Sequence, residues 1–144
     1  MDKSTNAEEP LYRELEHTSD LGIEVSAPTR AELFRRASLA LAALLVEPSQ
    51  VESRRQLMFD IAGDDVELMH DLLTELLQLF AADGFIWCDA AVEEQDRALH
   101  VTLRGEPFDT ARHTSRSEIK GVTYHQLTVE NVSNEWRTRI IFDV

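Results

Sequence analysis

The sequence DDVELMHDLLTELLQLF (residues 64–80) carries the clearest pattern in this chain of 144 residues. Apolar side chains recur there at intervals of three and four positions, which gathers them on one face of an α-helix. They are Met69, Leu72, Leu73, Leu76, Leu77 and Phe80. Asp64 and Glu67 have the spacing of a capping box, and Asp83-Gly84 ends the helix. We therefore predict a long helix whose apolar face is buried.

A second helix and several strands flank this helix in the sequence. The second helix begins at Pro28-Thr29, where Thr29 and Glu32 form another predicted capping box, and it ends before Pro48. Alternating or apolar segments between turn residues predict strands at 12–16, 21–25, 57–61, 85–92, 99–105, 121–130 and 135–144, with a loop at 107–118. The order is ββαβα followed by four strands. The predicted class is α+β, a two-layer, mostly antiparallel sheet packed against two helices.

Length and composition indicate one globular domain behind a short tail. We assign residues 1–11 to a flexible N-terminal tail and residues 12–144 to a single domain. No apolar run approaches the roughly 18–20 residues that span a bilayer, and the polar N-terminus lacks the features of a secretory signal. The lone Cys88 cannot form an internal disulfide, and its apolar strand predicts a buried, inert thiol. We therefore expect a cytoplasmic protein without membrane contacts.

The charge of the chain is strongly negative. It has 14 Lys and Arg residues against 27 Asp and Glu residues, a net charge of −13. A negative field repels a phosphate backbone, so no stable direct binding of nucleic acid is expected. Such a surface attracts cations and basic partners instead, although solubility alone also explains it.

Residues 16–20 and the last five residues contain the most unusual polar groups. Glu16-His17-Thr18-Ser19-Asp20 puts a carboxylate, an imidazole and hydroxyls on one turn, a composition that ordinary turn chemistry also explains. Asp143 interrupts the apolar strand Ile140–Val144, and Val144 adds a terminal carboxylate. If this strand pairs near the early turn, Asp20 supplies a third anionic group, and hard oxygens suit Ca²⁺ or Mg²⁺. The alternative is that Asp143 is a solvated strand end.

The segment Lys120–His125 is a third candidate. Lys120 begins a strand in a chain with few basic residues, so it presents a cation beside an acidic site or contacts a partner. The alternative for Lys120 is a surface salt bridge of little energetic value. Tyr124 and His125 are a conceivable catalytic pair, or residues at the core edge with one polar end in water. Zinc-site spacings and phosphate-binding glycine loops are absent from the sequence.

Four segments in this order and spacing resemble the archease family. They are His17-Thr18-Ser19-Asp20-Leu21-Gly22, the helix that contains Asp65, Glu67 and Glu75-Leu76-Leu77, Ile119-Lys120-Gly121-Val122-Thr123-Tyr124-His125, and Trp136–Val144. The resemblance covers residues 12–144. Small residues replace small ones at Ser19 and Gly121, and His70-Asp71 stands where the family often has an aromatic residue.

This resemblance implies an accessory protein rather than an enzyme. Archeases promote guanylylation and multiple turnover of the GTP-dependent RNA-splicing ligase, which joins 2′,3′-cyclic-phosphate or 3′-phosphate ends to 5′-hydroxyl ends. They are described as binding a divalent cation, usually calcium, although magnesium or manganese is conceivable. The ligands transfer to Asp20, Asp143 and the carboxylate of Val144. Lys120 transfers as an activity residue, and His17 and His125 are further expected partner contacts.

Two other functions remain open at this level. One is a small metal-dependent phosphoester hydrolase that uses His17, Asp20, His125 and Asp143, although no nucleophile–base motif is recognisable. The other is a chaperone-like modulator of RNA-modifying enzymes. Turnover by the protein alone would support the first, and client binding that does not depend on Asp20 would support the second.

Overall fold

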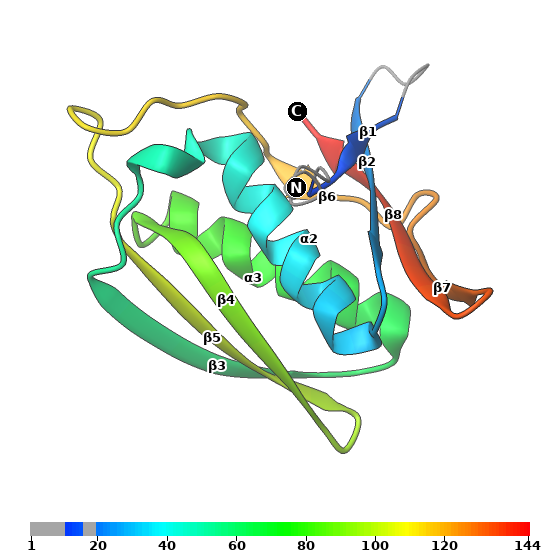
Figure 1. The fold of residues 1–144 in the computed structure, drawn as a ribbon. Coiled ribbons are helices and arrows are strands. Elements are labelled where there is room, and N and C mark those ends of the chain that lie inside the picture. The colour runs from blue at the N-terminus through cyan, green and yellow to red at the C-terminus, as the bar shows by residue number, and fades with distance from the viewer. Residues whose placement is uncertain (1–10, 16–19) are drawn as a thin grey trace, which may run out of the picture.

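The computed structural model describes residues 11–15 and 20–144 (Figure 1). Their elements are β1 (Arg13–Glu14), β2 (Leu21–Ala27), α2 (Arg30–Leu45), a 3₁₀ turn η1 (Pro48–Gln50), β3 (Arg55–Ala62), α3 (Asp65–Ala81), β4 (Phe85–Gln95), β5 (Ala98–Pro107), β6 (Gly121–Val122), β7 (Thr128–Val132) and β8 (Glu135–Asp143). The predicted α+β class, with antiparallel strands and the helices at their predicted places, is confirmed. No helix in the described ranges is long and apolar enough to cross a membrane.

The strands divide between two antiparallel sheets. One has the order β1-β2-β8-β6, with β7 also paired to β8, and the other has the order β3-β5-β4. Helices α2 and α3 fill the space between the sheets, and each contacts strands of both (Figure 1). The alternation that predicted the strands is a local signal, so it did not reveal how they divide between sheets.

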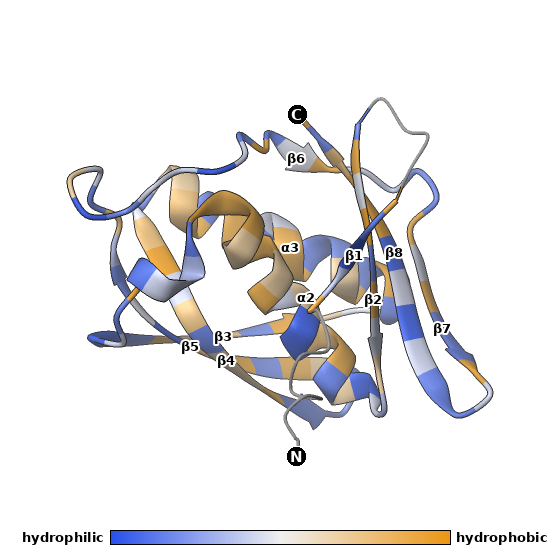
Figure 2. Ribbon diagram, turned by 45° about the horizontal axis from the view of Figure 1, so that its top comes forward, coloured by the Kyte–Doolittle hydropathy of each residue, from blue (hydrophilic) through white to orange (hydrophobic). Residues whose placement is uncertain are grey.

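Helix α3 lies at the centre of the core, as its periodicity predicts. Five of its apolar side chains have no exposed surface, namely Leu68, Met69, Leu72, Leu73 and Leu76. Its capping box is complete, because the Glu67 N–H donates to Asp64 Oδ1 over 3.0 Å and the Asp64 N–H donates to Glu67 Oε1 over 3.1 Å. Figure 2 shows the hydrophobic stretches of α2 and α3 between the two sheets.

The capping box predicted for α2 forms only in part. The Glu32 N–H donates to Thr29 Oγ1 over 3.2 Å, so Thr29 caps the helix. The Glu32 carboxylate instead accepts hydrogen bonds from Arg35 and Arg36, each over 3.0 Å. Two guanidinium groups one turn along the helix compete with a single backbone N–H, and they attract the carboxylate more strongly.

The predicted strand 121–130 is wrong as one continuous element. It divides into β6 and β7, with a turn over residues 123–127 between them. The Leu127 N–H donates to the Tyr124 carbonyl over 3.1 Å, and Gln126 has a φ of 58°, which is incompatible with a strand. The hairpin that follows turns where predicted, with positive φ at Ser133 and Asn134.

Cys88 lies at an irregularity in β4 and is half-buried rather than fully buried as predicted. The register between β4 and β5 shifts between Trp87 and Asp89. Gly105 lies opposite Trp87, and a Cβ atom there would be 2.0 Å from the Ile86 carbonyl oxygen, so the close approach requires glycine. Burial raises the pKa of the Cys88 thiol, which keeps it protonated and unreactive.

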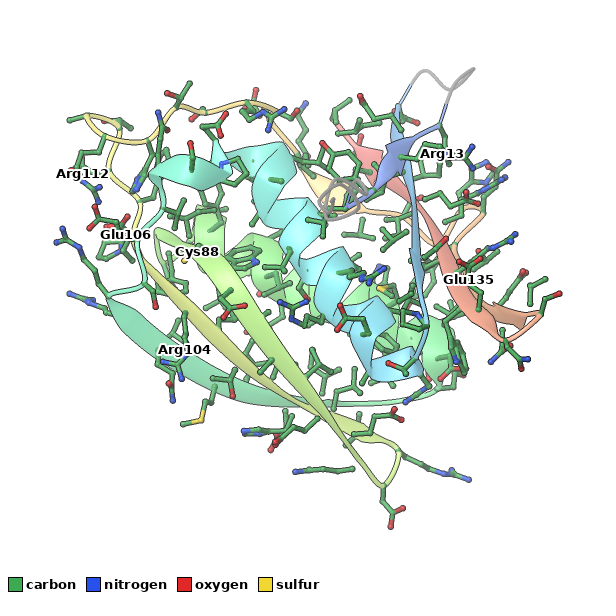
Figure 3. The ribbon with its side chains drawn as sticks, in the orientation of Figure 1. Arg13, Cys88, Arg104, Glu106, Arg112 and Glu135 are labelled. Atoms are coloured by element: carbon green, nitrogen blue, oxygen red, sulfur yellow. The ribbon has the colours of Figure 1, made fainter. Side chains whose placement is uncertain are left out.

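The loop over residues 107–118 is anchored by a buried carboxylate, Glu106, at the end of β5 (Figure 3). Glu106 accepts hydrogen bonds from the Glu52 N–H over 2.7 Å, from His113 Nε2 over 2.9 Å and from the Arg112 guanidinium. The Asp109 N–H donates to His113 Nδ1 over 2.9 Å, so the ring carries its proton on Nε2, facing Glu106. This network holds the start of the segment that leads to β6.

The hydrogen bonds to Glu106 outweigh the effect of its burial. Burial alone raises the pKa of a carboxyl group, but the bonds from the Glu52 N–H, His113 and Arg112 lower the pKa of Glu106 to about 2. The carboxylate is therefore ionised in the folded protein at every pH above about 3.

Replacing Glu106 with Gln should lower the free energy of unfolding by about 3 kcal/mol at pH 7, the order expected when a buried ion pair loses one partner. The folded-state pKa lies below the unfolded value near 4.5, so this stabilisation is complete above pH 4.5 and disappears as the pH falls toward 2. Urea denaturation at pH 7, 4.5 and 3 measures the difference between the two proteins. A difference that stays constant over this range would contradict the assignment.

Candidate functional site

Asp20 and Asp143 lie at the same end of the five-stranded sheet. In the antiparallel pair of β2 and β8, Leu21 is opposite Phe142 and Gly22 is opposite Ile141. Asp20 immediately precedes Leu21, and Asp143 immediately follows Phe142. Both aspartates are exposed. The register therefore brings together two residues that are far apart in the sequence. This is the pairing of the last strand beside the early turn on which the predicted cation site depended.

Lys120 and Val144 flank this end of the sheet. The Lys120 N–H donates to the backbone carbonyl of Asp143 over 2.7 Å, and Gly121 of β6 is the register partner of Asp143. Val144 follows directly and is 45% exposed. The Lys120 side chain is exposed and forms no ion pair with any residue that the structure describes. We call the group Asp20, Lys120, Asp143 and Val144 the sheet-end cluster.

Gly22 shapes the strand next to this cluster. A Cβ atom at Gly22 would lie 3.0 Å from Ile141 Cδ1 and 3.3 Å from two atoms of the Leu15 side chain. The absence of a side chain at Gly22 lets Leu15 and Ile141 pack there, on the face away from the helices. Ile141 is only 3% exposed, although alternation placed it on the face opposite the buried Ile140 and Phe142. The last strand is therefore buried on both faces before it emerges at Asp143.

The sequence interpretation predicted two histidines, His17 and His125, for this site. His17 lies outside the described residues. His125 lies in the turn between β6 and β7, where its N–H donates to Thr123 Oγ1 over 3.2 Å. Within the described ranges, its ring forms no hydrogen bond or ion pair, and no three or more His, Cys, Asp or Glu side chains gather as a metal site.

A pair of stacked rings, the exposed Tyr124 and the half-buried His70, lies near the cluster, and the sequence interpretation did not find it. Tyr124 stacks on His70 of α3 with ring centroids 3.9 Å apart and ring planes 10° apart. His70 Nδ1 lies 3.0 Å from a carboxylate oxygen of Asp71, which fixes the orientation of the ring. Partial desolvation, followed by the negative charges of Asp71 and Glu67 on α3 and of its N-cap Asp64, raises the pKa of the Tyr124 hydroxyl. The tyrosine is therefore a neutral hydrogen-bond donor at physiological pH.

A groove of about 280 Å³ separates α3 from the segment 119–122. We call it the α3–β6 groove. It is lined by His70, Thr74, Leu77, Gln78, Ala81, Ile119, Lys120, Gly121 and Val122. Lys120 thus belongs to two features, since its backbone bonds to Asp143 and the residue lines the groove.

Comparisons with known proteins agree over nearly the whole chain. Residues 12–144 match the Archease protein family. The chain is 33% identical to the archease of Methanopyrus kandleri, over 92% of this chain and 99% of that protein. It is 30% identical to the archease of Pyrococcus furiosus, over 92% and 98% of the two chains.

Solved structures of similar proteins share the fold. The solution structure of Methanobacterium thermoautotrophicum protein 1598 has 27% sequence identity and a TM-score of 0.75, covering 92% of this chain and 98% of that one. The crystal structure of a Thermotoga maritima archease, described as a possible chaperone, has 20% identity and a TM-score of 0.65, covering 90% and 94%. The arrangement of sheets and helices described above is therefore shared with both.

Proposed function

Because this chain belongs to the archease family, we propose that it is an accessory protein that activates a GTP-dependent RNA-splicing ligase and is not itself an enzyme. In this role it promotes guanylylation of the ligase and supports repeated turnover. The observation that carries the proposal is the sheet-end cluster, where Asp20, Asp143 and Lys120 converge although they come from distant parts of the sequence.

The cluster has the chemistry of a site for a divalent cation. Calcium is the proposed ion, with magnesium or manganese as alternatives, and its ligands are the carboxylates of Asp20, Asp143 and Val144. Carboxylate oxygens are the hard donors that these ions prefer. Carboxylates held at one end of a sheet repel each other, and a cation relieves that repulsion. When bound, the ion supplies a positive charge that polarises phosphate or carboxylate oxygens of the partner.

Electrostatics supports docking of the sheet-end cluster into the active-site cleft of the ligase. A cleft that holds RNA and GTP must be basic, and this chain has a net charge of −13. Opposite charges accelerate encounter and lose their effect as salt rises. Lys120 supplies a positive charge beside the aspartates, and His17 and His125 are proposed as further contacts. The same negative field disfavours stable binding of RNA to this chain, and we expect the complex to work in the cytoplasm.

The two competing functions have less support. A phosphoester hydrolase would need His125 beside the aspartates, and no contact in the described residues joins them. A chaperone-like modulator of several RNA-modifying enzymes would bind clients without Asp20. Pull-down of the cognate ligase and of unrelated RNA-modifying enzymes, with wild-type and Asp20→Asn protein, separates this function from ligase activation.

Asp20→Asn and Asp143→Asn should each weaken calcium binding by more than about 100-fold. Loss of a group that only hydrogen-bonds to a metal ligand already costs roughly 10–100-fold in affinity. The larger effect is expected because each change removes one charged ligand of the proposed ion. The rise in Tm with added calcium measures binding, because a ligand of the folded state alone stabilises it by mass action. Asp96→Asn, in the exposed β4–β5 turn, is the matched control and should keep the full shift.

Four residues appended after Val144 should also reduce calcium affinity, because they replace the terminal carboxylate with a neutral peptide group. The same four residues added before Met1 are the control. Isothermal titration with calcium measures both proteins. Equal affinities would remove the terminal carboxylate from the ligand set.

Ligase guanylylation and turnover at limiting ligase should rise with wild-type protein and should fall at least about tenfold with Asp20→Asn, Asp143→Asn or Lys120→Gln. Each change removes one charge from the sheet-end cluster. A tenfold loss of stimulation corresponds to only about 1.4 kcal/mol of interaction free energy. Circular dichroism verifies that each variant is folded. Full stimulation by folded Asp20→Asn and Asp143→Asn would reject the site, and absence of stimulation by the wild-type chain would reject the function.

A further inference from the structure

We infer that the α3–β6 groove binds an extended, mainly apolar segment of the partner ligase whose single carboxylate meets Lys120. This inference rests on the proposed function and adds to it a second contact, which shares Lys120 with the sheet-end cluster. The sheet-end cluster would act in the active-site cleft, and the groove would hold the two proteins together.

The walls of the groove suit an extended chain. Helix α3 forms one wall and the edge of the five-stranded sheet forms the other, because β8 is the only strand paired with β6 in the described residues. Leu77, Ala81 and Ile119 provide apolar surface between them. A Cβ atom at Gly121 would have no neighbour within 4 Å among the described residues, so this face of the strand is open. Extended peptides commonly dock on sheet edges, with side chains in adjoining pockets.

The charge of the groove selects the occupant. Lys120 is the only lysine among the described residues. It lines the groove, and its ammonium group forms no ion pair with any of them. A carboxylate is the complementary group that this ammonium lacks. A polyanion such as RNA fits poorly, because Asp71 and other carboxylates on α3 lie close enough to raise the pKa of Tyr124. A segment with one carboxylate and otherwise apolar side chains can pair with Lys120 and adds little negative charge beside the carboxylates near Tyr124.

The stacked rings give the groove a rigid edge. His70 lines the groove, and Tyr124 lies flat against it with 54% of its surface exposed. The contact between His70 and Asp71 holds the pair in place before any partner arrives. Tyrosine is enriched among residues that dominate binding energy, and a fixed side chain loses little entropy on binding. The pair thus provides an aromatic contact next to the charge of Lys120.

A groove-filling substitution tests the inference. Ala81 and Ala82 are consecutive, exposed residues at the end of α3, and only Ala81 lines the groove. Ala81→Trp should raise the Kd of the complex with the cognate ligase at least tenfold, whereas Ala82→Trp should change it less than twofold. Biolayer interferometry with the full-length proteins measures both values. Equal Kd values for the wild-type chain and Ala81→Trp would overturn the inference.

The readout of binding separates this inference from the proposed activation. Ala81→Trp should recover full stimulation of the ligase at saturating concentration, since the sheet-end cluster is intact. Weakened binding by Ala81→Trp supports the groove even if the wild-type chain does not stimulate the ligase, a result that would reject only the activation. Absence of binding by the wild-type chain would overturn the groove as well.

The identity of the occupant has its own test. Lys120→Met keeps the apolar part of the side chain and removes the charge, so it should raise Kd about tenfold and reduce its dependence on salt, whereas Lys120→Arg should restore binding. A benzoylphenylalanine at position 82, beside the groove at a site that accepts a large side chain, should crosslink to a ligase segment that contains an acidic residue. Crosslinks to RNA, to a second copy of this chain or to a segment without an acidic residue would overturn the inference.

Discussion

The antiparallel pairing of β2 with β8 is the constraint on which the rest of the structure depends. It joins an early strand to the last one over seven consecutive register pairs, from Leu21 opposite Phe142 to Ala27 opposite Trp136. Everything between these strands in the sequence must leave and return to the same sheet. The two helices therefore fill the space behind it, and the second sheet closes the other side (Figure 1). The same pairing carries Asp20 and Asp143 to one end of the sheet.

Carboxylates are used in two opposite ways in this molecule. Glu106 is buried, and three donors, including the charged Arg112, stabilise its negative charge strongly enough to overcome burial. Asp20 and Asp143 are exposed at a sheet end, where the charge can attract a ligand. The first arrangement stabilises a loop and the second is suited to binding. A buried carboxylate with complete hydrogen bonding has little left to offer a partner, whereas an exposed one is accessible to it.

The short strand β6 connects the two surfaces that we assign to the ligase. On one side its segment is hydrogen-bonded to the strand that carries Asp143, and on the other it forms a wall of the α3–β6 groove. The network around Glu106 fixes the start of the loop that leads to it. A partner segment in the groove would therefore press on the same residues that flank the proposed ion. The two contacts share a strand, which gives a physical route for binding at one to influence the other.

Local sequence patterns were sufficient for the helices, the capping of α3, most strands and the turn before β8. These features depend on neighbours no more than four positions apart, with a period of two in strands and of three to four in helices. The family resemblance rested on four segments and pointed to Asp20, Lys120 and Asp143, positions that the residues alone had already marked as unusual. Other features depend on contacts between residues distant in the chain, and only the tertiary structure decided them. These are the division into two sheets, the break after Val122, the burial of Ile141 on the outer face, the anchoring of Glu106 by His113 and the groove beside α3. The periodicity of a segment indicates which face of its helix or strand is buried. Which residues pack against that face depends on the packing of the whole chain.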